Sequence, residues 1–115
     1  MIQEGQITLF KFHQTDQAPG KLRPALVLRK LPGAHDDWLI CMISSQLSQE
    51  IPGFDEIIYE NDLDFDISGL KTSSVIRITR LAVVNKDILL GTTGNVSDTR
   101  LNSIKSRLSS WIKDT

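Results

Sequence analysis

The residues best suited to chemistry lie at 21–28, where Lys21, Arg23 and Pro24 directly precede the apolar run Ala25 to Leu28. Arg23 presents a planar fork of five N–H donors, which matches the oxygens of a phosphate or a carboxylate. Pro24 fixes its own φ and favours an extended conformation for Arg23. The segment predicts a charged hydrogen-bond donor at the start of a buried strand, and a binding site requires such a rigidly held donor. A surface arginine before a core strand is the alternative.

Further polar side chains stand where other predicted strands begin or end. They are Ser44, Ser45 and Gln46 after one strand, and Ser73, Ser74, Arg77 and Arg80 in another. If strands 22–29 and 38–44 pair as an antiparallel hairpin, Arg23 and Ser44 become neighbours. An arginine beside hydroxyl groups can hold a phosphodiester and stabilise charge that develops at phosphorus. The alternative for the serines is a structural role, in which their hydroxyls only form hydrogen bonds at the ends of the strands. One of the two arginines, Arg77 or Arg80, is expected to form an ion pair with an acid in 50–66.

Metal sites are excluded by residue spacing. His13 and His35 have no cysteine or carboxylate at the spacing of zinc ligands. Asp62, Asp64 and Asp66 begin like a calcium-binding loop, but its sixth position is an isoleucine and its twelfth a serine, where glycine and glutamate are required. We therefore expect no metal and no cofactor.

The composition is that of a soluble globular protein. The 115 residues, 40% of them hydrophobic, are enough for a single domain over 1–115. No apolar run approaches the roughly 20 residues that span a bilayer, and the N-terminus does not resemble a signal peptide. We expect a cytoplasmic protein that does not bind membranes.

The lone cysteine, Cys41, lies among apolar residues, which favours a buried, inert thiol over a catalytic one.

Charge is divided unevenly along the chain, although the formal net charge is only −1. Residues 31–70 contain nine acids and neither lysine nor arginine, whereas the rest of the chain contains all 13 basic residues and five acids. A basic face can therefore exist under a nearly neutral total, and its local potential would attract a polyanion such as nucleic acid. The acidic stretch is expected to be a solvated face or a shield for the basic half.

Hydrophobic periodicity predicts five to seven short strands followed by one helix. The predicted strands cover 6–12, 22–29, 38–44, 54–59, 72–84 with a bend near Arg80, and 88–93. Ser97 is the predicted N-cap of the helix, and apolar residues at helical spacing between Leu101 and Ile112 give it one apolar stripe. The pattern predicts a mainly β fold of the α+β class, a small barrel or strongly bent sheet with a helix packed on it.

Four short motifs occur along the chain in a set order. They are Gly5-Gln6-Ile7, Gly20-Lys21-Leu22-Arg23-Pro24-Ala25-Leu26-Val27-Leu28, Ile43-Ser44-Ser45-Gln46, and Ser74-Val75-Ile76-Arg77 within 70–81. In this order they resemble the MazF/PemK (Kid) family of toxin–antitoxin ribonucleases, and the resemblance covers nearly the whole chain. It implies an SH3-like barrel with a C-terminal helix that acts as a homodimer.

The same resemblance implies an activity, the cleavage of single-stranded RNA without a metal. The ribose 2′-OH would attack the adjacent phosphorus and leave a cyclic phosphate and a free 5′-OH. The family's catalytic arginine and threonine correspond to Arg23 and Ser44, and Arg77 matches an arginine that some members use. The expected RNA-binding residues are Lys21, Ser45, Gln46, Ser74, Arg77 and Arg80.

The resemblance also implies partners and an alternative function. An antitoxin with an acidic tail would block the RNA groove, and the complex would bind operator DNA. The chain departs from the family at Gln6, which replaces an acid, at Ser44, which replaces threonine, and at Thr79, where some members have an acid–base aspartate. The histidine that those members have before the signature is absent. The alternative is a non-catalytic binding module of the same fold, such as a gyrase poison, an operator-bound repressor or a non-toxic barrel.

Overall fold

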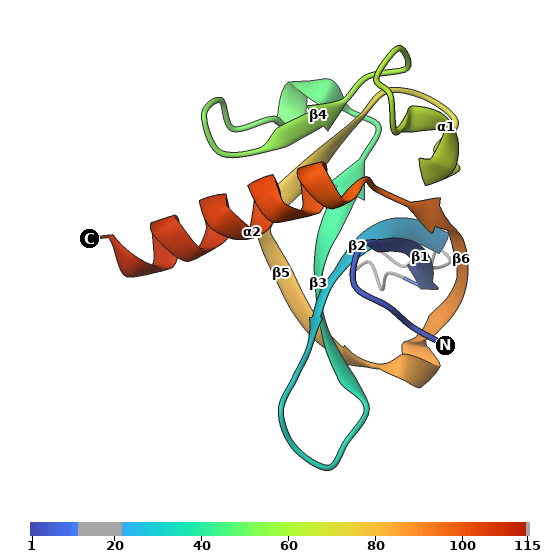
Figure 1. Ribbon diagram of the computed structural model, residues 1–115. Helices are drawn as coiled ribbons and strands as arrows, with labels where there is room; N and C mark the ends of the chain where they lie inside the picture. Colours follow the sequence, from blue (N-terminus) through green and yellow to red (C-terminus); the bar gives the residue numbers. More distant parts are fainter. Residues whose placement is uncertain (12–21, 115) are drawn as a thin grey trace, which may run out of the picture.

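The computed structural model describes residues 1–11 and 22–114, and within them the elements follow the predicted order (Figure 1). Six strands precede a C-terminal helix, so the predicted α+β class and strand number are confirmed. The elements are β1 (Gln6–Lys11), β2 (Leu22–Lys30), β3 (Asp37–Ser44), η1 (Leu47–Gln49), β4 (Glu56–Ile58), α1 (Phe65–Ser68), β5 (Ser74–Asn85), η2 (Lys86–Ile88), β6 (Leu89–Asn95) and α2 (Asp98–Lys113).

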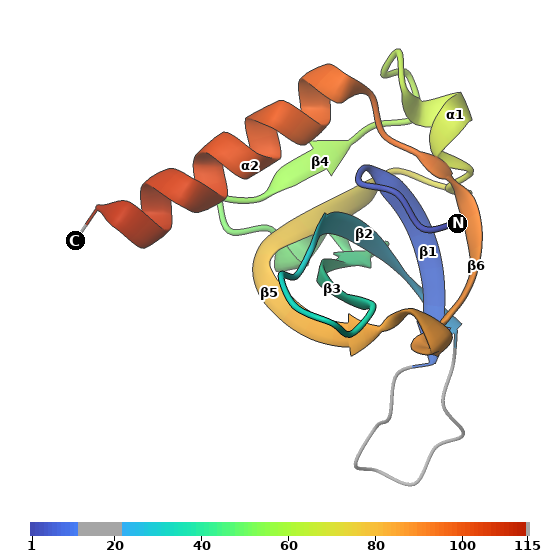
Figure 2. The ribbon, with the colours of Figure 1, turned by 60° about the horizontal axis from the view of Figure 1, so that its bottom comes forward.

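The strands form one antiparallel sheet in the order β4-β5-β3-β2-β1-β6. The predicted hairpin of β2 and β3 is present, with Ala25 opposite Met42. Figure 2 shows how strongly the sheet curls, with β5 bending around its side. In the described part of the chain the edge strands β4 and β6 do not pair with each other, so the barrel-like sheet stays open.

A bulge interrupts β5 at the bend that the sequence predicts. Cys41 pairs with Leu81, but the next residue of β3, Met42, pairs with Arg77. The three residues 78–80 therefore have no counterpart on β3, and they turn the strand sharply, as bulges do.

A buried carboxylate, that of Asp55, holds this bulge in place. It accepts the backbone N–H of Ile78 at 3.0 Å and that of Ile51 at 2.9 Å, and its residue is only 4% exposed. A backbone donor that the bulge removes from the ladder is thus satisfied by a side chain. The expectation that the acidic stretch is a solvated face is wrong for Asp55.

Both faces of the sheet bury apolar side chains, because successive residues of a strand point to opposite sides. One face packs against α2 through Leu101, Ile104 and Leu108. The opposite face buries a second cluster. Its members are Phe10, Ala25, Val27, Trp38, Ile40 and Leu89. The lone thiol, Cys41, is fully buried on the α2 side, and burial raises its pKa to about 12, which agrees with an inert thiol.

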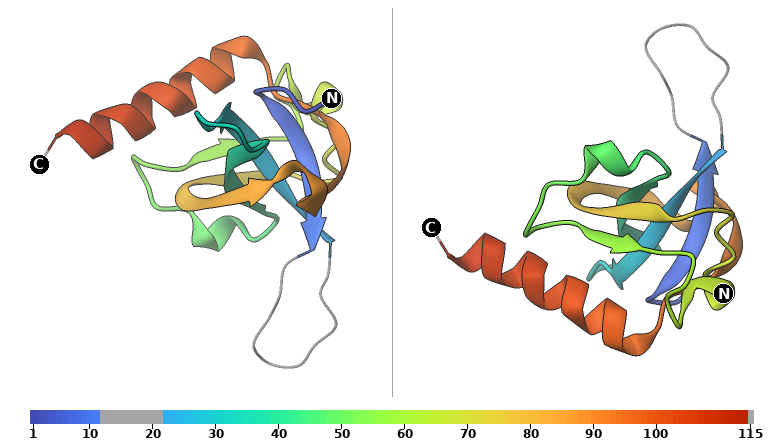
Figure 3. Two further views of the ribbon diagram at one scale, coloured as in Figure 1. Left: turned by 90° about the horizontal axis from the view of Figure 1, so that it is seen from below. Right: turned by 90° about the horizontal axis from the view of Figure 1, so that it is seen from above.

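Helix α2 begins as predicted, with the Ser97 hydroxyl accepting the N–H of Arg100 at 3.1 Å. Its C-terminal half extends away from the sheet (Figure 3). The last two residues of the predicted apolar stripe, Trp111 and Ile112, are therefore exposed, and Trp111 packs edge-on against Phe54. Across 1–11 and 22–114, no helix combines the length and apolarity that a bilayer-spanning helix requires.

The short helix α1 lies directly against the backbone of β6, and glycine makes this contact possible (Figure 1). A Cβ on Gly94 would lie 2.0 Å from the carbonyl oxygen of Ile67, far inside van der Waals contact. The Thr93 hydroxyl donates to the carbonyl of Ser68 at 2.9 Å beside it, so the two segments cannot separate freely.

We expect Gly94→Ala to lower the free energy of unfolding by about 2–3 kcal/mol, because the added methyl group must push α1 away from β6. The melting temperature should fall by roughly 10 °C. Gly91→Ala on the same strand is the matched control, since nothing lies within 4 Å of its Cβ position. Circular dichroism melts of both variants test the contact, and equal melting temperatures would contradict it.

Candidate functional site

Three neighbouring strands bring Arg23, Ser44 and Arg77 to one place. Because Ala25 of β2 lies opposite Met42 of β3, Arg23 and Ser44 reach the same end of the hairpin. Arg77 of β5 lies opposite Met42 on the other side of β3. Alternation along each strand then places the three side chains on one face of the sheet. The predicted proximity of Arg23 and Ser44 is therefore observed.

These side chains surround a pocket of about 300 Å³. It is lined by Arg23, Pro24, Met42, Ile43, Ser44, Ser45, Gln46, Gln49 and Arg77. Two guanidinium groups line it, and no carboxylate is among these described lining residues. The two guanidinium groups give this concave site a positive potential, which favours a bound anion. We call this the arginine pocket.

Arg77 contributes an incompletely satisfied guanidinium. Its Nε is buried and has no hydrogen-bond partner among the described residues. The predicted ion pair of Arg77 or Arg80 with an acid in 50–66 is wrong within the described residues, where the acids of that segment that form ion pairs are bound by Arg100 and Arg107. A buried N–H without an acceptor is costly, so the pocket is complete only when water or an anion supplies one.

The hydroxyl of Ser44 is oriented by the turn that ends β3. Its Oγ accepts the backbone N–H of Gln46 at 3.1 Å. A hydroxyl has one hydrogen to donate and two lone pairs, so this bond leaves the hydrogen available to a ligand in the pocket. A serine therefore supplies the same donor as a threonine at this position.

The arginine pocket contains further residues at the end of β3. Ser45 and Gln46 are exposed and line the pocket, as an RNA-binding role for them requires. Gln49 of η1 also lines it and was not among the residues that the sequence singled out. The sequence signal for Gln49 is weak, because η1 is a single helical turn and is too short to show hydrophobic periodicity.

Two other predicted RNA-binding residues, Ser74 and Arg80, are not among the described residues that line the pocket. Ser74 is buried, and its hydroxyl donates to the carbonyl of Thr72 at 2.9 Å. Arg80 is exposed in the β5 bulge, outside the lining. Lys21 lies outside the described residues, and its role stays a prediction.

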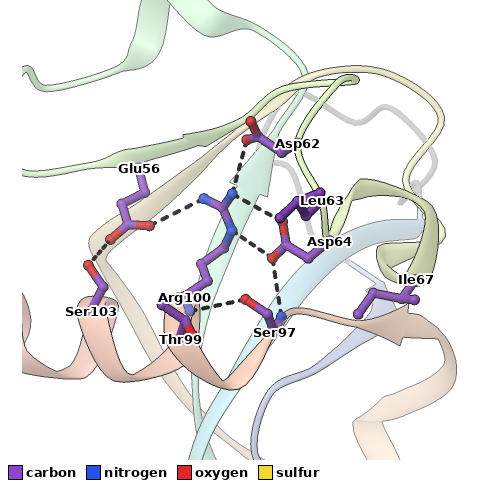
Figure 4. A pocket seen from close by; sticks show the side chains of 9 residues that line it. All are labelled: Glu56, Asp62, Leu63, Asp64, Ile67, Ser97, Thr99, Arg100 and Ser103. Atoms are coloured by element: carbon purple, nitrogen blue, oxygen red, sulfur yellow. Dashed lines mark hydrogen bonds and ion pairs between the residues drawn. The ribbon is translucent and has the colours of Figure 1, made fainter.

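A larger depression, of about 620 Å³, surrounds Arg100 at the start of α2 (Figure 4). Arg100 donates from Nε and Nη2 to Asp64 at 2.8 and 3.1 Å, from Nη2 to Asp62 at 3.0 Å, and from Nη1 to Glu56 at 3.3 Å. A further bond from Nη1 reaches the carbonyl of Ile57 at 3.4 Å, so every donor of the fork is used. We call Arg100 and its three carboxylates the Arg100 clasp.

The Arg100 clasp is structural, because every N–H donor of its guanidinium is already bonded to oxygen atoms of the protein itself. Burial alone would raise the pKa of Asp64, but hydrogen bonds from Arg100 and the N–H of Ser97, together with the charge of Arg100, hold it below the ordinary value. The clasp ties α2 to β4 and to the segment before α1 (Figure 4). The expectation of a solvated acidic face is therefore also wrong for Glu56 and Asp64. The arginine pocket remains the candidate site.

Comparisons with known proteins agree with this fold. A family model described as "PemK-like, MazF-like toxin of type II toxin-antitoxin system" matches residues 3–112. No curated protein matches the chain. Among solved structures, the chain is similar to an "Endoribonuclease in complex with its cognate antitoxin from Mycobacterial species", with a TM-score of 0.64 and 16% identity over 100% of this chain and 98% of that one. At this identity the likeness shows the shared fold.

Proposed function

The chain belongs to the PemK-like, MazF-like toxins of type II toxin–antitoxin systems, and we propose that it acts as a metal-independent endoribonuclease on single-stranded RNA. The observation that carries the proposal is the arginine pocket, in which Arg23, Ser44 and Arg77 converge from three strands without a carboxylate among the described lining residues. The similar solved structure is itself named an endoribonuclease, which supports the same activity.

In the proposed reaction, the scissile phosphodiester lies between Arg23 and Arg77. The ribose 2′-oxygen attacks phosphorus and the bond from phosphorus to O5′ breaks, which leaves a 2′,3′-cyclic phosphate and a free 5′-OH. Negative charge grows on the non-bridging oxygens as the fifth bond forms. Arg23 and the Ser44 hydroxyl donate to these oxygens and stabilise the transition state more than the ground state.

Proton transfer in this reaction does not depend on a carboxylate of the pocket. Thr79, where some relatives have an acid–base aspartate, lies in the β5 bulge and does not line the arginine pocket. We propose that water takes the 2′-OH proton and supplies one to O5′. The rate enhancement then comes from charge stabilisation and from holding the 2′-oxygen in line with the leaving oxygen.

The decisive test is digestion of single-stranded RNA by the purified protein in excess EDTA. We expect fragments with 5′-OH ends, which a polynucleotide kinase labels without prior phosphatase treatment, and 2′,3′-cyclic phosphate at the other end. Fragments that carry 5′-phosphates would contradict the mechanism. Growth arrest on expression while cellular RNA stays intact would instead favour the binding-module alternative.

The proposed function includes partners, and we place the protein in the cytoplasm, where its RNA would be. We propose a homodimer, an antitoxin whose acidic tail competes with RNA for the arginine pocket, and binding of operator DNA through the complex. A carboxylate-rich tail offers the same kind of oxygen acceptor that Arg23 and Arg77 would bind in a phosphate, which supports a shared site. The similar solved structure was determined with its cognate antitoxin.

A further inference from the structure

We propose that Gln49, together with Gln46, recognises the base of a nucleotide beside the scissile phosphate. This inference rests on the proposed RNA cleavage. It gives these two lining residues of the arginine pocket a role in selecting the sequence that is cut.

The side chains that line the arginine pocket fall into two chemically different groups. Arg23, Arg77 and Ser44 supply charged and hydroxyl donors, which suit a phosphate. Gln46 and Gln49 supply neutral amides, which attract a phosphate far less than a guanidinium does. A nucleotide whose phosphate is bound by the cationic group therefore leaves its sugar and base for the neutral amides of the same pocket.

The backbone that carries both amides is held firmly. The N–H of Gln46 donates to Ser44 Oγ at 3.1 Å, and the N–H of Gln49 donates to the carbonyl of Gln46 at 3.0 Å. The segment is anchored again two residues later, where the N–H of Ile51 donates to the buried carboxylate of Asp55 at 2.9 Å. A group that discriminates between bases needs such a fixed support, because a loose support accepts every base.

The two side chains, in contrast, are available to a ligand. Gln46 and Gln49 are exposed, and no residue in the described ranges hydrogen-bonds to either side-chain amide. A carboxamide offers one acceptor beside two donors, which matches a base edge that carries a donor next to an acceptor. Single-stranded RNA exposes such edges, because its bases are not paired.

Two further lining residues of the pocket are suited to the flat face of a base. Pro24 and Met42 line the pocket next to Arg23 and Arg77. Met42 is half-buried, and a thioether packs favourably against an aromatic ring. A base that packs on these apolar side chains is held in the same pocket that the two amides line, where hydrogen bonds can recognise its edge.

The test is a coupling measurement on a single-stranded RNA oligonucleotide that carries the mapped cleavage site. Each nucleotide flanking the cut is replaced in turn by an analogue that keeps the ring but lacks its exocyclic edge groups. The value of kcat/KM is measured for the unchanged protein, for Gln49→Ala and for Asn102→Ala, an exposed amide on α2 outside the pocket. Thermal melts confirm that each variant is folded.

We expect one analogue to lower kcat/KM of the unchanged protein by roughly 5- to 100-fold, the range for one well-placed base contact. Gln49→Ala should lose a similar factor on the natural RNA and little more on that analogue, because both changes remove the same contact. Asn102→Ala should behave like the unchanged protein. Losses that multiply, or a Gln49→Ala variant with unaltered kcat/KM, would overturn the inference while RNA cleavage stands. Absence of cleavage by the unchanged protein would overturn both.

Discussion

Replacement of Arg23 by alanine should lower the rate of RNA cleavage by about 10³-fold or more, the scale seen when a guanidinium that stabilises phosphoryl charge is removed. Arg23 lies at the pocket end of β2, and Arg77 remains on β5 to attract the RNA. The loss should therefore fall mainly on kcat, with a smaller change in KM. Arg23→Lys should recover little of the rate, because an ammonium keeps the charge but loses the planar fork.

The matched control is Arg29→Ala. Arg29 lies on the same strand, is exposed and does not line the arginine pocket, so its loss tests only the general effect of one fewer cation. Single-turnover assays in EDTA at low and high salt measure both variants, and circular dichroism melts check folding. Cleavage by folded Arg23→Ala at the rate of the unchanged protein would remove Arg23 from the mechanism.

The Arg23–Ser44 half of the pocket could be predicted from the sequence because it depends on one local hairpin. A short loop between two apolar strands fixes the pairing partner, and alternation then fixes which side chains share a face. Pro24 marks where the strand begins. The outcome is the observed register, in which Ala25 lies opposite Met42.

The position of Arg77 could not be predicted in the same way. Its strand pairs with β3 across the intervening residues 45–73, and the pairing is shifted by the 78–80 bulge. Three unpaired residues change which side chains share a face, so counting alternate positions through the bend gives the wrong face beyond it. Gln49 was missed for a related reason, since η1 is a single turn.

The Arg100 clasp was beyond sequence reasoning because charge patterning does not identify partners. Its carboxylates precede Arg100 by 36 to 44 residues, and four arginines or lysines of α2 could have bound them. The tertiary structure determines which of these basic residues bind the carboxylates, because β4 is an edge strand that lies beside α2 (Figure 1). Arg100 and Arg107 donate to the free carbonyls of Phe54, Asp55 and Ile57 there, and so cover an edge that would otherwise expose unpaired acceptors.

Replacement of Arg100 by methionine should lower the free energy of unfolding by about 3–5 kcal/mol, the cost of leaving buried carboxylates without their cation. The side chains of Arg100 and Asp64 are only 14% and 7% exposed, so water does little to replace the lost partner. This is a large part of the roughly 5–15 kcal/mol that stabilises a typical domain. Arg29→Met, which removes an exposed cation, should change the stability by less than about 0.5 kcal/mol.

The pH dependence separates this effect from a general loss of packing. In the unchanged protein the pKa of Asp64 is lower in the folded than in the unfolded state, so its contribution is present above pH of about 4 and is lost as the pH falls through the folded pKa. In Arg100→Met, burial acts on Asp64 without the cation and raises its pKa, so protonation at mildly acidic pH relieves the variant. Urea unfolding at pH 7 and pH 5 should therefore show a smaller stability gap at pH 5. A gap that stays constant or widens would mean that lost packing of the arginine stem, and not an uncompensated carboxylate, destabilises the variant.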